Sequence, residues 1–269
     1  MTVVSELDTS TPNGARAYNG LLGALEPLLR PDREMNARLE AVFPPGEPGP
    51  RDLAIANRVY LQRAVSQAVH GRARQVLDLG AGYPVHRLQP RGAPALRPLH
   101  EEARKAHPEA RCAYVDRDLQ VVSHGRAAVR GIPGVTYALA DLADVAAVAG
   151  CPDVRQVIDW RWPVTVIFGL TLHFWSASEA RRIVQGYLNG MAPGSRLVIT
   201  VPWWRDEALF HRVQGAYGVA ELHNHTRVQV EALFRGTSPL GSGIEVAQGE
   251  AGVAGREASA CVLGGVGLV

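Results

Sequence analysis

A ten-residue stretch, Gln75-Val-Leu-Asp-Leu-Gly-Ala-Gly-Tyr-Pro84, constrains the fold of this chain more than any other part of the sequence. A short apolar run leads to Asp78 and then to two glycines in Gly-x-Gly spacing, Gly80 and Gly82. Glycine suits a tight turn after a buried strand because the backbone takes positive φ and approaches a ligand closely. In open α/β sheets, ligands bind beyond the carboxyl ends of the central strands, so the turn predicts a binding site. An ordinary strand-to-loop turn is the alternative that this motif alone leaves open.

Two acidic residues farther along the chain support a binding site. Asp116 ends a second apolar strand over residues 111–116, where an acid can accept hydrogen bonds from both hydroxyls of a ribose. Asp141 follows a third predicted strand over residues 134–138, and we expect it near the amino group of an adenine. The three signals together predict a nucleoside site.

The third glycine of the dinucleotide-binding fingerprint is absent, because Val85 stands at its position. That glycine lets a helix pack closely beneath a pyrophosphate. Its loss argues against NAD or FAD, so a nicotinamide oxidoreductase is a remote alternative. The pattern favours a nucleoside ligand without phosphates, of which S-adenosylmethionine is the commonest.

Charge and cysteine content limit the partners that we expect. The 269 residues include 28 Lys and Arg against 26 Asp and Glu, a formal net charge of +2. This balance gives no indication of a nucleic acid or a membrane surface as partner and favours a small-molecule substrate. Cys112, Cys151 and Cys261 show neither a disulfide framework nor metal-ligand spacing, so we expect no metal. The sequence leaves open whether the protein forms a homodimer.

The N-terminus lacks a basic segment followed by an apolar core, so we expect no signal peptide. No apolar run is long enough to span a bilayer. The simplest expectation is a cytoplasmic protein.

Hydrophobic periodicity predicts alternating strands and helices. Two further strands are expected over residues 163–170 and 195–201, and an antiparallel pair over 244–247 and 258–266. The predicted helices, with Ser178 as the N-cap of the fifth, cover residues 55–69, 99–106, 120–129, 144–149, 179–188, 206–214 and 226–234. Alternation of this kind predicts an α/β fold with a mostly parallel, seven-stranded sheet and helices on both faces.

Several of these segments match a known family. The chain resembles the S-adenosyl methyltransferase family found widely in actinobacteria, a branch of the Rossmann-like class I methyltransferases. The matching pieces are Ala17-Tyr-Asn-Gly-Leu-Leu-Gly23, Ala56-Asn-Arg58, Val76-Leu-Asp-Leu-Gly-Ala-Gly-Tyr-Pro84, Tyr114-Val-Asp-Arg-Asp118, Ala140-Asp-Leu142, Leu172-His-Phe174 and Gly264-Gly-Val-Gly267.

The resemblance implies S-adenosylmethionine as cofactor and S-adenosylhomocysteine as product. It implies an N-terminal helical lid over residues 1–70 and a cofactor-binding domain over 71–269, with a substrate-facing insertion near 202–225. A packing extension without catalytic duty is the alternative for the leader. The cofactor-binding candidates are Asp78, Gly80, Ala81, Gly82, Asp116, Arg117, Asp141, Leu142 and Gly169.

The chain departs from the family in two segments where substrate is expected to bind. An acidic, lysine-containing run usual in the leader is replaced by residues 24–29, Ala-Leu-Glu-Pro-Leu-Leu. Polar residues usual after the fifth strand are replaced by Pro202-Trp203-Trp204.

Aromatic side chains are candidates for the wall around the reacting centre. Methyl transfer is an in-line displacement from a positively charged sulfonium, which aromatic faces stabilise. The substrate-binding candidates are Tyr18, Phe174, Trp175, Trp203, Trp204 and His223. Packing is the alternative for each of them. We predict that the two adjacent indoles sandwich a flat aromatic acceptor.

A general base is sought first in His173 and next in His225 and His223, because the unperturbed pKa of histidine, about 6.5, lies near working pH. Tyr18 is a third catalytic candidate that could contact the cofactor or orient the acceptor. A structural role in hydrogen bonding is the alternative for His173. Many methyltransferases acting on good nucleophiles need no base.

The sequence therefore predicts a methyltransferase of secondary metabolism that acts on a small natural product at N, O or carbon. The aromatic candidates suggest an indole-containing acceptor such as an alkaloid or a cyclic dipeptide. Two alternatives stay open: a cyclisation or rearrangement assisted by the cofactor without net transfer, and a ligand-binding protein without activity on the same scaffold.

Overall fold

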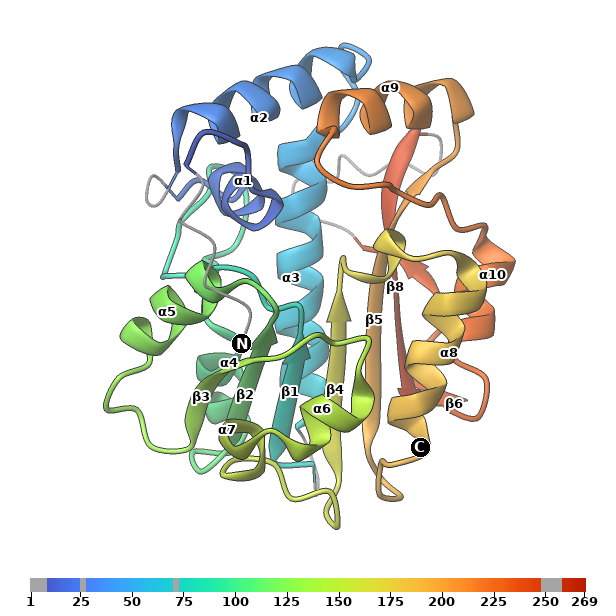
Figure 1. The fold of residues 1–269 in the computed structure, drawn as a ribbon. Helices are drawn as coiled ribbons and strands as arrows, with labels where there is room; N and C mark the ends of the chain where they lie inside the picture. Colours follow the sequence, from blue (N-terminus) through green and yellow to red (C-terminus); the bar gives the residue numbers. More distant parts are fainter. Residues whose placement is uncertain (1–8, 25–27, 70–72, 248–257) are drawn as a thin grey trace.

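A single mixed sheet with helices on both faces forms the core of the computed structural model (Figure 1). The structure describes residues 9–24, 28–69, 73–247 and 258–269. The boundary predicted at residue 70 lies outside this part, as do residues 25–27 of the departing leader segment. The strands are β1 Gln75–Leu79, β2 Arg111–Asp116, β3 Val135–Leu139, β4 Val164–Gly169, β5 Arg196–Trp204, β6 Ser238–Pro239, β7 Glu245–Val246 and β8 Ala260–Leu268.

The strand order β3-β2-β1-β4-β5-β8-β6 places β1 at the centre of the five parallel strands. Strands β1 to β5 are parallel, and β8 runs antiparallel to β5. The chain moves outward from β1 to β3 and then crosses to β4 on the other side of β1. That reversal is a topological switch point, where open α/β sheets have a crevice at the carboxyl ends of the strands.

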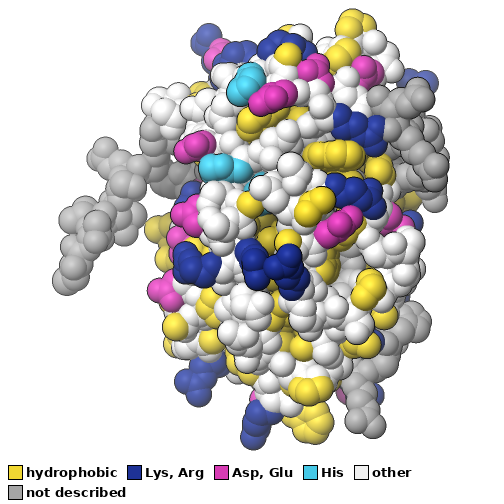
Figure 2. All heavy atoms as spheres, turned by 90° about the vertical axis from the view of Figure 1, so that its right-hand side faces the viewer, with side chains coloured by type: hydrophobic (Ala, Val, Ile, Leu, Met, Phe, Trp, Pro, Cys, Tyr) yellow, Lys and Arg dark blue, Asp and Glu magenta, His cyan; other side chains and the backbone are white. Residues whose placement is uncertain are grey.

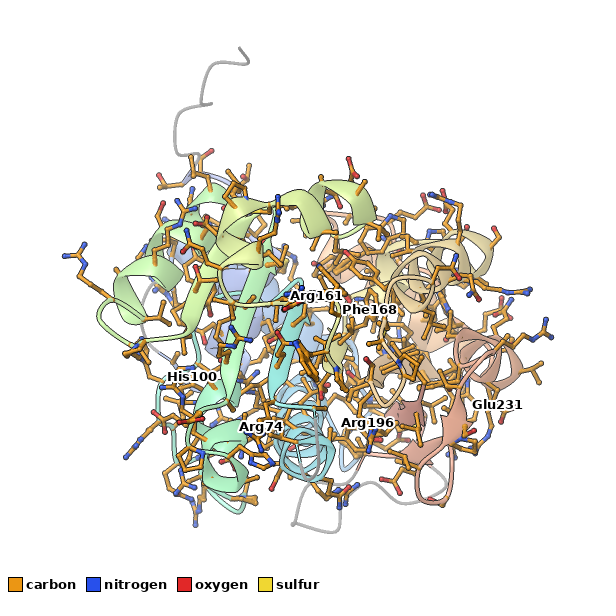
Figure 3. All side chains as sticks on the ribbon, turned by 90° about the horizontal axis from the view of Figure 1, so that it is seen from below. Arg74, His100, Arg161, Phe168, Arg196 and Glu231 are labelled. Atoms are coloured by element: carbon orange, nitrogen blue, oxygen red, sulfur yellow. The ribbon has the colours of Figure 1, made fainter. Side chains whose placement is uncertain are left out.

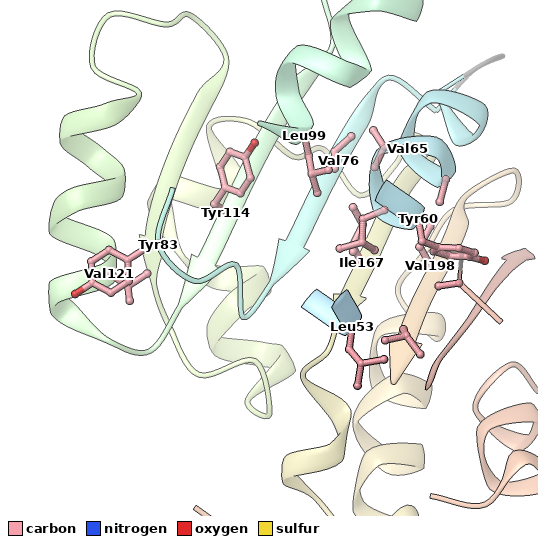
Figure 4. Packing of buried hydrophobic residues seen from close by; sticks show 14 of the residues in the cluster. Leu53, Tyr60, Val65, Val76, Tyr83, Leu99, Tyr114, Val121, Ile167 and Val198 are labelled. Carbon is pink, nitrogen blue, oxygen red and sulfur yellow. The ribbon is translucent and has the colours of Figure 1, made fainter. Parts of the chain in front are cut away.

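Helices cover both faces of the sheet because the buried strands are apolar on both sides. On β1, Val76 faces one hydrophobic cluster and Leu77 faces the other. Figure 4 shows Tyr60 and Val65 of α3 packed against Ile167 and Val198 of the sheet. The helices are α1 Gly14–Leu21, α2 Arg30–Val42, α3 Pro50–Ala68, α4 Leu99–Ala106, α5 Leu119–Ala128, α6 Val145–Gly150, α7 Pro152–Arg155, α8 Ala177–Leu188, α9 Glu207–Tyr217 and α10 Arg227–Leu233, with a 3-10 turn, η1, over Leu172–Phe174.

The predicted Rossmann-like, mostly parallel α/β fold is confirmed, including the antiparallel pairing of β7 with β8. Within the described residues the sheet has eight strands rather than seven, because the two-residue strand β6 pairs with β8. A segment of that length carries no periodic signal in the sequence, so its pairing depends on the neighbouring strand.

Three boundaries differ from the prediction, two for local reasons and one because of strand pairing. Helix α3 begins at Pro50, since proline is favoured in the first turn of a helix. Ser176, and not Ser178, is the N-cap of α8: its side chain accepts from the Glu179 N–H, and the Glu179 side chain in turn accepts from the backbone of Ser176. Strand β5 continues through Trp204 because it pairs with β8 as far as Ala260.

The two ends of the parallel strands differ in character. Figure 3, seen from below, shows Arg74, Arg161 and Arg196 near the end where β1, β4 and β5 begin. At the opposite end, α1, α2 and α9 lie above the carboxyl ends of the strands (Figure 1). The leader and the segment after β5 thus form a roof over the predicted crevice.

A buried ion pair holds this roof together. The Arg16 Nε of α1 lies 2.8 Å from an Asp32 carboxylate oxygen of α2, and the two side chains are 2% and 0% exposed. Asp32 also accepts from the backbone N–H groups of Asn13 and Leu29. Arg16 donates to Gln120 as well, which ties the leader to α5.

Replacing Arg16 with methionine should destabilise the protein, because it leaves the Asp32 carboxylate buried without its cation. Breaking a buried pair in this way costs about 3–5 kcal/mol. The matched control is Arg30→Met, since Arg30 pairs with Glu34 on the surface, where their side chains are 84% and 52% exposed. Thermal unfolding should show a clear fall in Tm for Arg16→Met and none for Arg30→Met. Equal effects would contradict a structural role for the buried pair.

Candidate functional site

A cavity of about 480 Å³ lies between the carboxyl ends of the parallel strands and the roof. Its walls include the glycine turn after β1, the end of β2, the loop after β4 and the last residues of β5. Helices α1, α2, α3 and α9, the loop after β3 and the segment after α9 contribute much of the remaining lining. Its volume falls within the range of about 300–1,000 Å³ that is usual for small-molecule sites.

The glycine turn is held against the end of β2. The backbone N–H groups of Gly80 and Ala81 donate to the Val115 carbonyl oxygen at 2.8 and 3.0 Å. Gly80 has φ of 71°, and a Cβ there would lie 2.5 Å from the Thr171 side chain. Glycine is therefore required at this position by both backbone conformation and space.

Asp116, the last residue of β2, lies on the cavity wall beside the glycine turn. Its carboxylate accepts from the Gly82 N–H at 2.9 Å and from the Asp118 N–H at 3.0 Å. Burial raises the pKa of the Asp116 carboxyl, while these backbone hydrogen bonds lower it. Each carboxylate oxygen keeps a second lone pair, so the group can accept further hydrogen bonds from a ligand.

The cavity brings together every predicted cofactor-binding residue, from four different strand ends. This convergence follows from the parallel sheet, because the carboxyl ends of its strands meet at one edge. The residues on the cavity wall are Asp78, Gly80, Ala81, Gly82, Asp116, Arg117, Asp141, Leu142 and Gly169.

The predicted catalytic residues are divided between the cavity and its surroundings. His173 lines the cavity, but burial and the neighbouring His225 and His223 lower its pKa to about 3. Its imidazole is therefore neutral at physiological pH and a weak proton acceptor. The His225 Nε2 lies 3.0 Å from the Trp175 carbonyl oxygen, and neither His225 nor His223 is part of the cavity lining. A carbonyl oxygen only accepts, so His225 carries its proton on Nε2.

The Tyr18 ring lines the cavity, while its hydroxyl is held within the protein. Asn57 donates to the Tyr18 hydroxyl at 2.8 Å, and that hydroxyl lies 3.3 Å from the Ala54 carbonyl oxygen. The Thr200 hydroxyl donates to Asn57 at 2.7 Å and accepts from the Leu170 N–H at 3.1 Å. Helices α1 and α3 are thereby connected to β5 and to the loop after β4.

The end of this hydrogen-bond chain holds a strained residue. Leu170 has φ of 52°, a left-handed conformation that is uncommon for a residue with a side chain. It directly precedes Thr171 and lines the cavity. Such strain persists only where surrounding contacts enforce it, and it clusters at functional sites.

The predicted sandwich of two indoles is wrong. Because β5 continues through both tryptophans, their side chains point to opposite faces of the sheet. Trp204 lines the cavity and packs in one hydrophobic cluster, whereas Trp203 packs against the other, 4.8 Å from the Arg205 guanidinium carbon. Phe174 and Trp175, the other predicted aromatic residues, do line the cavity.

Sequence reasoning missed part of the cavity wall. Helix α2 contributes Met35 and Leu39, and α9 contributes Val213 and Tyr217. These helices are distant in sequence and meet only in the folded chain, so no local motif indicates them. Arg58 belongs to one of the segments that carry the family resemblance, but the sequence predicts no binding or catalytic role for it. It is 5% exposed and lines the cavity, as does Asp78.

Within residues 9–24, 28–69, 73–247 and 258–269, no group of three or more His, Cys, Asp or Glu side chains is arranged to hold a metal ion. No helix in the described part of the chain combines the length and the apolar character needed to cross a bilayer. On the molecular face shown in Figure 2, basic and acidic side chains are interspersed.

A family model described as S-adenosyl methyltransferase matches residues 1–267. The chain belongs to this family. It is an S-adenosylmethionine-dependent methyltransferase, as the resemblance implied. No functionally curated protein matches the sequence.

Solved structures agree with the family. A protein from Thermobifida fusca YX described as a methyltransferase is 27% identical, with a TM-score of 0.80 over 97% of this chain and 96% of that chain. A DUF574 family protein from Streptomyces avermitilis MA-4680 is 24% identical, with a TM-score of 0.83 over 97% of this chain and 98% of that one. The N-methyltransferase NodS from Bradyrhizobium japonicum WM9, in complex with S-adenosyl-L-homocysteine, shares the fold at 13% identity, with a TM-score of 0.51 over 94% and 98% of the two chains.

The residues of the cavity fit this cofactor. Bound S-adenosylmethionine supplies an electrophilic methyl group on a sulfonium. Asp116 has acceptor capacity for ribose hydroxyls, and Asp141, which accepts from the Ala143 N–H through one oxygen, has a second oxygen for a donor such as an amino group. The buried Arg58 Nε has no hydrogen-bond partner among the described residues. This atom is therefore free to donate to a ligand in the cavity.

Gly80→Ala should weaken binding of S-adenosylhomocysteine at least about tenfold, because the new methyl group displaces Thr171 in the cavity wall. The control is Gly92→Ala: φ there is 75°, but nothing lies within 4 Å of a Cβ. Both variants meet the same backbone strain, and only the first changes the cavity. Calorimetric titration measures both; wild-type affinity in Gly80→Ala would contradict the tight fit of the turn.

Proposed function

We propose that this enzyme transfers the methyl group of S-adenosylmethionine to a small, flat and uncharged acceptor with an aromatic ring. The observation that carries the proposal is an aromatic cluster, defined as His173, Phe174, Trp204 and Tyr217, on the wall of the cofactor cavity. The acceptor class, and not the family, is what remains to be tested.

The rings of the aromatic cluster contact one another across three elements. The His173 and Phe174 centroids are 4.2 Å apart, and Phe174 lies 6.1 Å from Tyr217 of α9. Trp204 meets His173 edge-on at 6.4 Å. Planar rings at these separations favour another aromatic ring over a branched aliphatic group. The cluster replaces the paired indoles as the proposed acceptor wall.

The scarcity of charged side chains on one part of the cavity wall supports an uncharged acceptor. The lining residues that α2, β5 and α9 contribute in the described structure include no Asp, Glu, Lys or Arg. They are chiefly apolar, with Met35, Leu39 and Val213 among them. A charged acceptor would lose its hydration there without gaining a partner. The carboxylates Asp78, Asp116 and Asp141 lie instead on the strand ends assigned to the cofactor.

In this proposal the leader, residues 1–70, acts as a lid, and residues 202–225 form the substrate-facing part of the 71–269 domain. The Arg38 guanidinium of α2 reaches the Ala216 carbonyl oxygen of α9 at 3.4 Å. The Asn13 amide donates to Asp118, two residues from Asp116, at 2.6 Å. Closure of these contacts excludes water from the sulfonium and orients the acceptor for in-line attack.

His173 acts in the proposal as a neutral hydrogen-bonding group that orients the acceptor, and not as a strong base. Its lowered pKa favours an acceptor that is already a good nucleophile, or one that releases its proton to solvent. His225 and His223 support the wall behind Trp175 and His173: His225 contacts the Trp175 carbonyl oxygen, and the His223 N–H donates to the His173 carbonyl oxygen. Tyr18 contributes its ring to the cavity.

We further propose that the acceptor is a natural product, with indole-type compounds as the first probes, and that the enzyme works in the cytoplasm. A homodimer is compatible with this proposal. A cyclisation or rearrangement without net transfer remains the competing reaction, because the same aromatic wall would stabilise a cationic intermediate.

The decisive experiment incubates the enzyme with methyl-labelled S-adenosylmethionine and a panel of indoles, phenols and, for comparison, aliphatic amines of similar size. Mass spectrometry should detect an aromatic product heavier by one methylene unit. Unchanged mass with a new product would favour rearrangement, and transfer only to aliphatic amines would contradict an aromatic acceptor. The Asp116→Ala variant, which should fold but not turn over, gives the background.

Trp204→Leu should raise KM for the acceptor about fivefold and leave the affinity for S-adenosylhomocysteine unchanged, because it removes one aromatic face worth about 1 kcal/mol. Trp203→Leu is the matched control, since it makes the same substitution on the opposite face of β5. The KM values of the two variants are compared by steady-state kinetics at a temperature below the Tm of both. An equal rise in KM in the two variants would show that the effect comes from the strand and not from the cavity.

A further inference from the structure

Several side chains that line the cofactor cavity carry a buried polar atom without a hydrogen-bond partner. Within the described residues these atoms are Asn36 Oδ1, Arg58 Nε, Thr171 Oγ1, His173 Nδ1 and Trp204 Nε1. Buried polar groups are paired in most proteins, by protein atoms or by ordered water, so each exception calls for an explanation. The atoms differ in what they can bind, and Trp204 Nε1 is the one that restricts a ligand most.

The Trp204 indole can only donate a hydrogen bond. A hydroxyl group rotates and both donates and accepts, whereas the indole N–H has one fixed direction and accepts nothing. Trp204 is 6% exposed, so its N–H loses hydration in the folded protein without gaining a protein partner. A ligand group that pairs with this N–H must therefore be a hydrogen-bond acceptor.

Asn224 holds Trp204 in place through the main chain. The Trp204 backbone N–H donates to Asn224 Oδ1 at 3.2 Å, and Asn224 Nδ2 donates to the Trp204 carbonyl oxygen at 2.7 Å. Strand β5 also pairs with β8 at this residue, opposite Ala260. Both polar ends of the Asn224 side chain are thus used by the backbone. The residue is fixed on the cavity wall while its indole N–H stays unpaired.

The rings around the Trp204 indole bring no charge. The centroid of the Phe210 ring of α9 lies 5.3 Å from that of Trp204, and the His173 centroid lies 6.4 Å away. Phe210 has no polar side-chain atom. Burial, together with two neighbouring histidines, lowers the pKa of His173 to about 3, so its imidazole is neutral at physiological pH. This part of the wall suits a neutral acceptor atom, because a carboxylate would lose its hydration without meeting a cation.

We propose that the methyl acceptor carries a neutral oxygen on its ring system, a carbonyl or phenolic oxygen, and that this oxygen accepts a hydrogen bond from Trp204 Nε1–H. The proposal rests on the aromatic acceptor proposed above and narrows it to ring ketones, lactams and phenols. The aromatic cluster holds the plane of the acceptor ring, and the hydrogen bond fixes its rotation within that plane. Trp204 therefore determines which atom of the acceptor faces the methyl group.

The test uses three probes with the same bicyclic skeleton: indane, 1-indanone and 4-indanol. Each is titrated by calorimetry into the full chain saturated with S-adenosylhomocysteine, so that no methyl group is transferred. At least one of the two oxygenated probes should bind about tenfold or more tightly than indane, as expected when a buried donor gains its partner. The comparison of 1-indanone with 4-indanol distinguishes a carbonyl from a phenolic oxygen.

Trp204→Phe keeps an aromatic face and removes the N–H. It should reduce the preference for the oxygenated probe to less than about threefold and change the affinity for indane less than about threefold. Trp203→Phe is the matched control, since Trp203 lies on the opposite face of β5, and it should keep the wild-type preference. In ¹H–¹⁵N spectra of the wild-type protein, the Trp204 Nε1–H resonance, assigned from its contacts with Phe210, should move downfield with the oxygenated probe and not with indane.

Equal affinities of the wild-type protein for all three probes would overturn this proposal and leave the aromatic acceptor standing, and this result needs no folded variant. A preference that persists in Trp204→Phe, or a Trp204 resonance that does not move, would also overturn it. If S-adenosylhomocysteine binds and none of the three probes does, both this proposal and the aromatic acceptor are contradicted.

Discussion

The contact between the turn after β1 and the end of β2 is the constraint on which the site depends. Two N–H groups of the turn donate to one carbonyl oxygen, that of Val115, and a third donates to the Asp116 carboxylate. This arrangement is reached only if β1 and β2 are parallel neighbours with their ends level. It also requires glycine at position 80, because a side chain there would collide with Thr171. The cofactor site therefore forms only in a sheet with this topology.

The helices of the roof are joined to their neighbours by contacts of different kinds. Buried polar contacts hold α1 to α2 and to α5, whereas α2 meets α9 through fewer polar contacts and apolar side chains. The Tyr18–Asn57–Thr200 chain connects the leader to strained Leu170 at the floor of the cavity. Hydrogen bonds therefore run from the leader to the residue that precedes Thr171 and the loop with His173.

The electrostatics of the cavity divide it in two. The strand ends supply Asp78, Asp116 and Asp141, with Arg58 as the buried cation, and this half suits a charged nucleoside derivative. The half beneath α2 and α9 carries rings and aliphatic side chains. The proposed transfer of a methyl group from a cation to an uncharged ring uses both environments within one cavity. The depressed pKa of His173 is a consequence of this division, since the imidazole lies on the apolar side.

The sequence by itself determined the strands, the glycine turn and the acids that end β2 and follow β3, because these signals are local and parallel strands end at one edge. It predicted most helices to within a few residues, but not the two-residue β6. Tertiary structure decided the rest. Trp203 and Trp204 lie on opposite faces of the sheet because β5 continues through both residues in its pairing with β8. In a strand, consecutive side chains point to opposite faces. The meeting of α2 with α9, and of Arg58 with Asp78, depends on packing between segments distant in sequence, which no local pattern records.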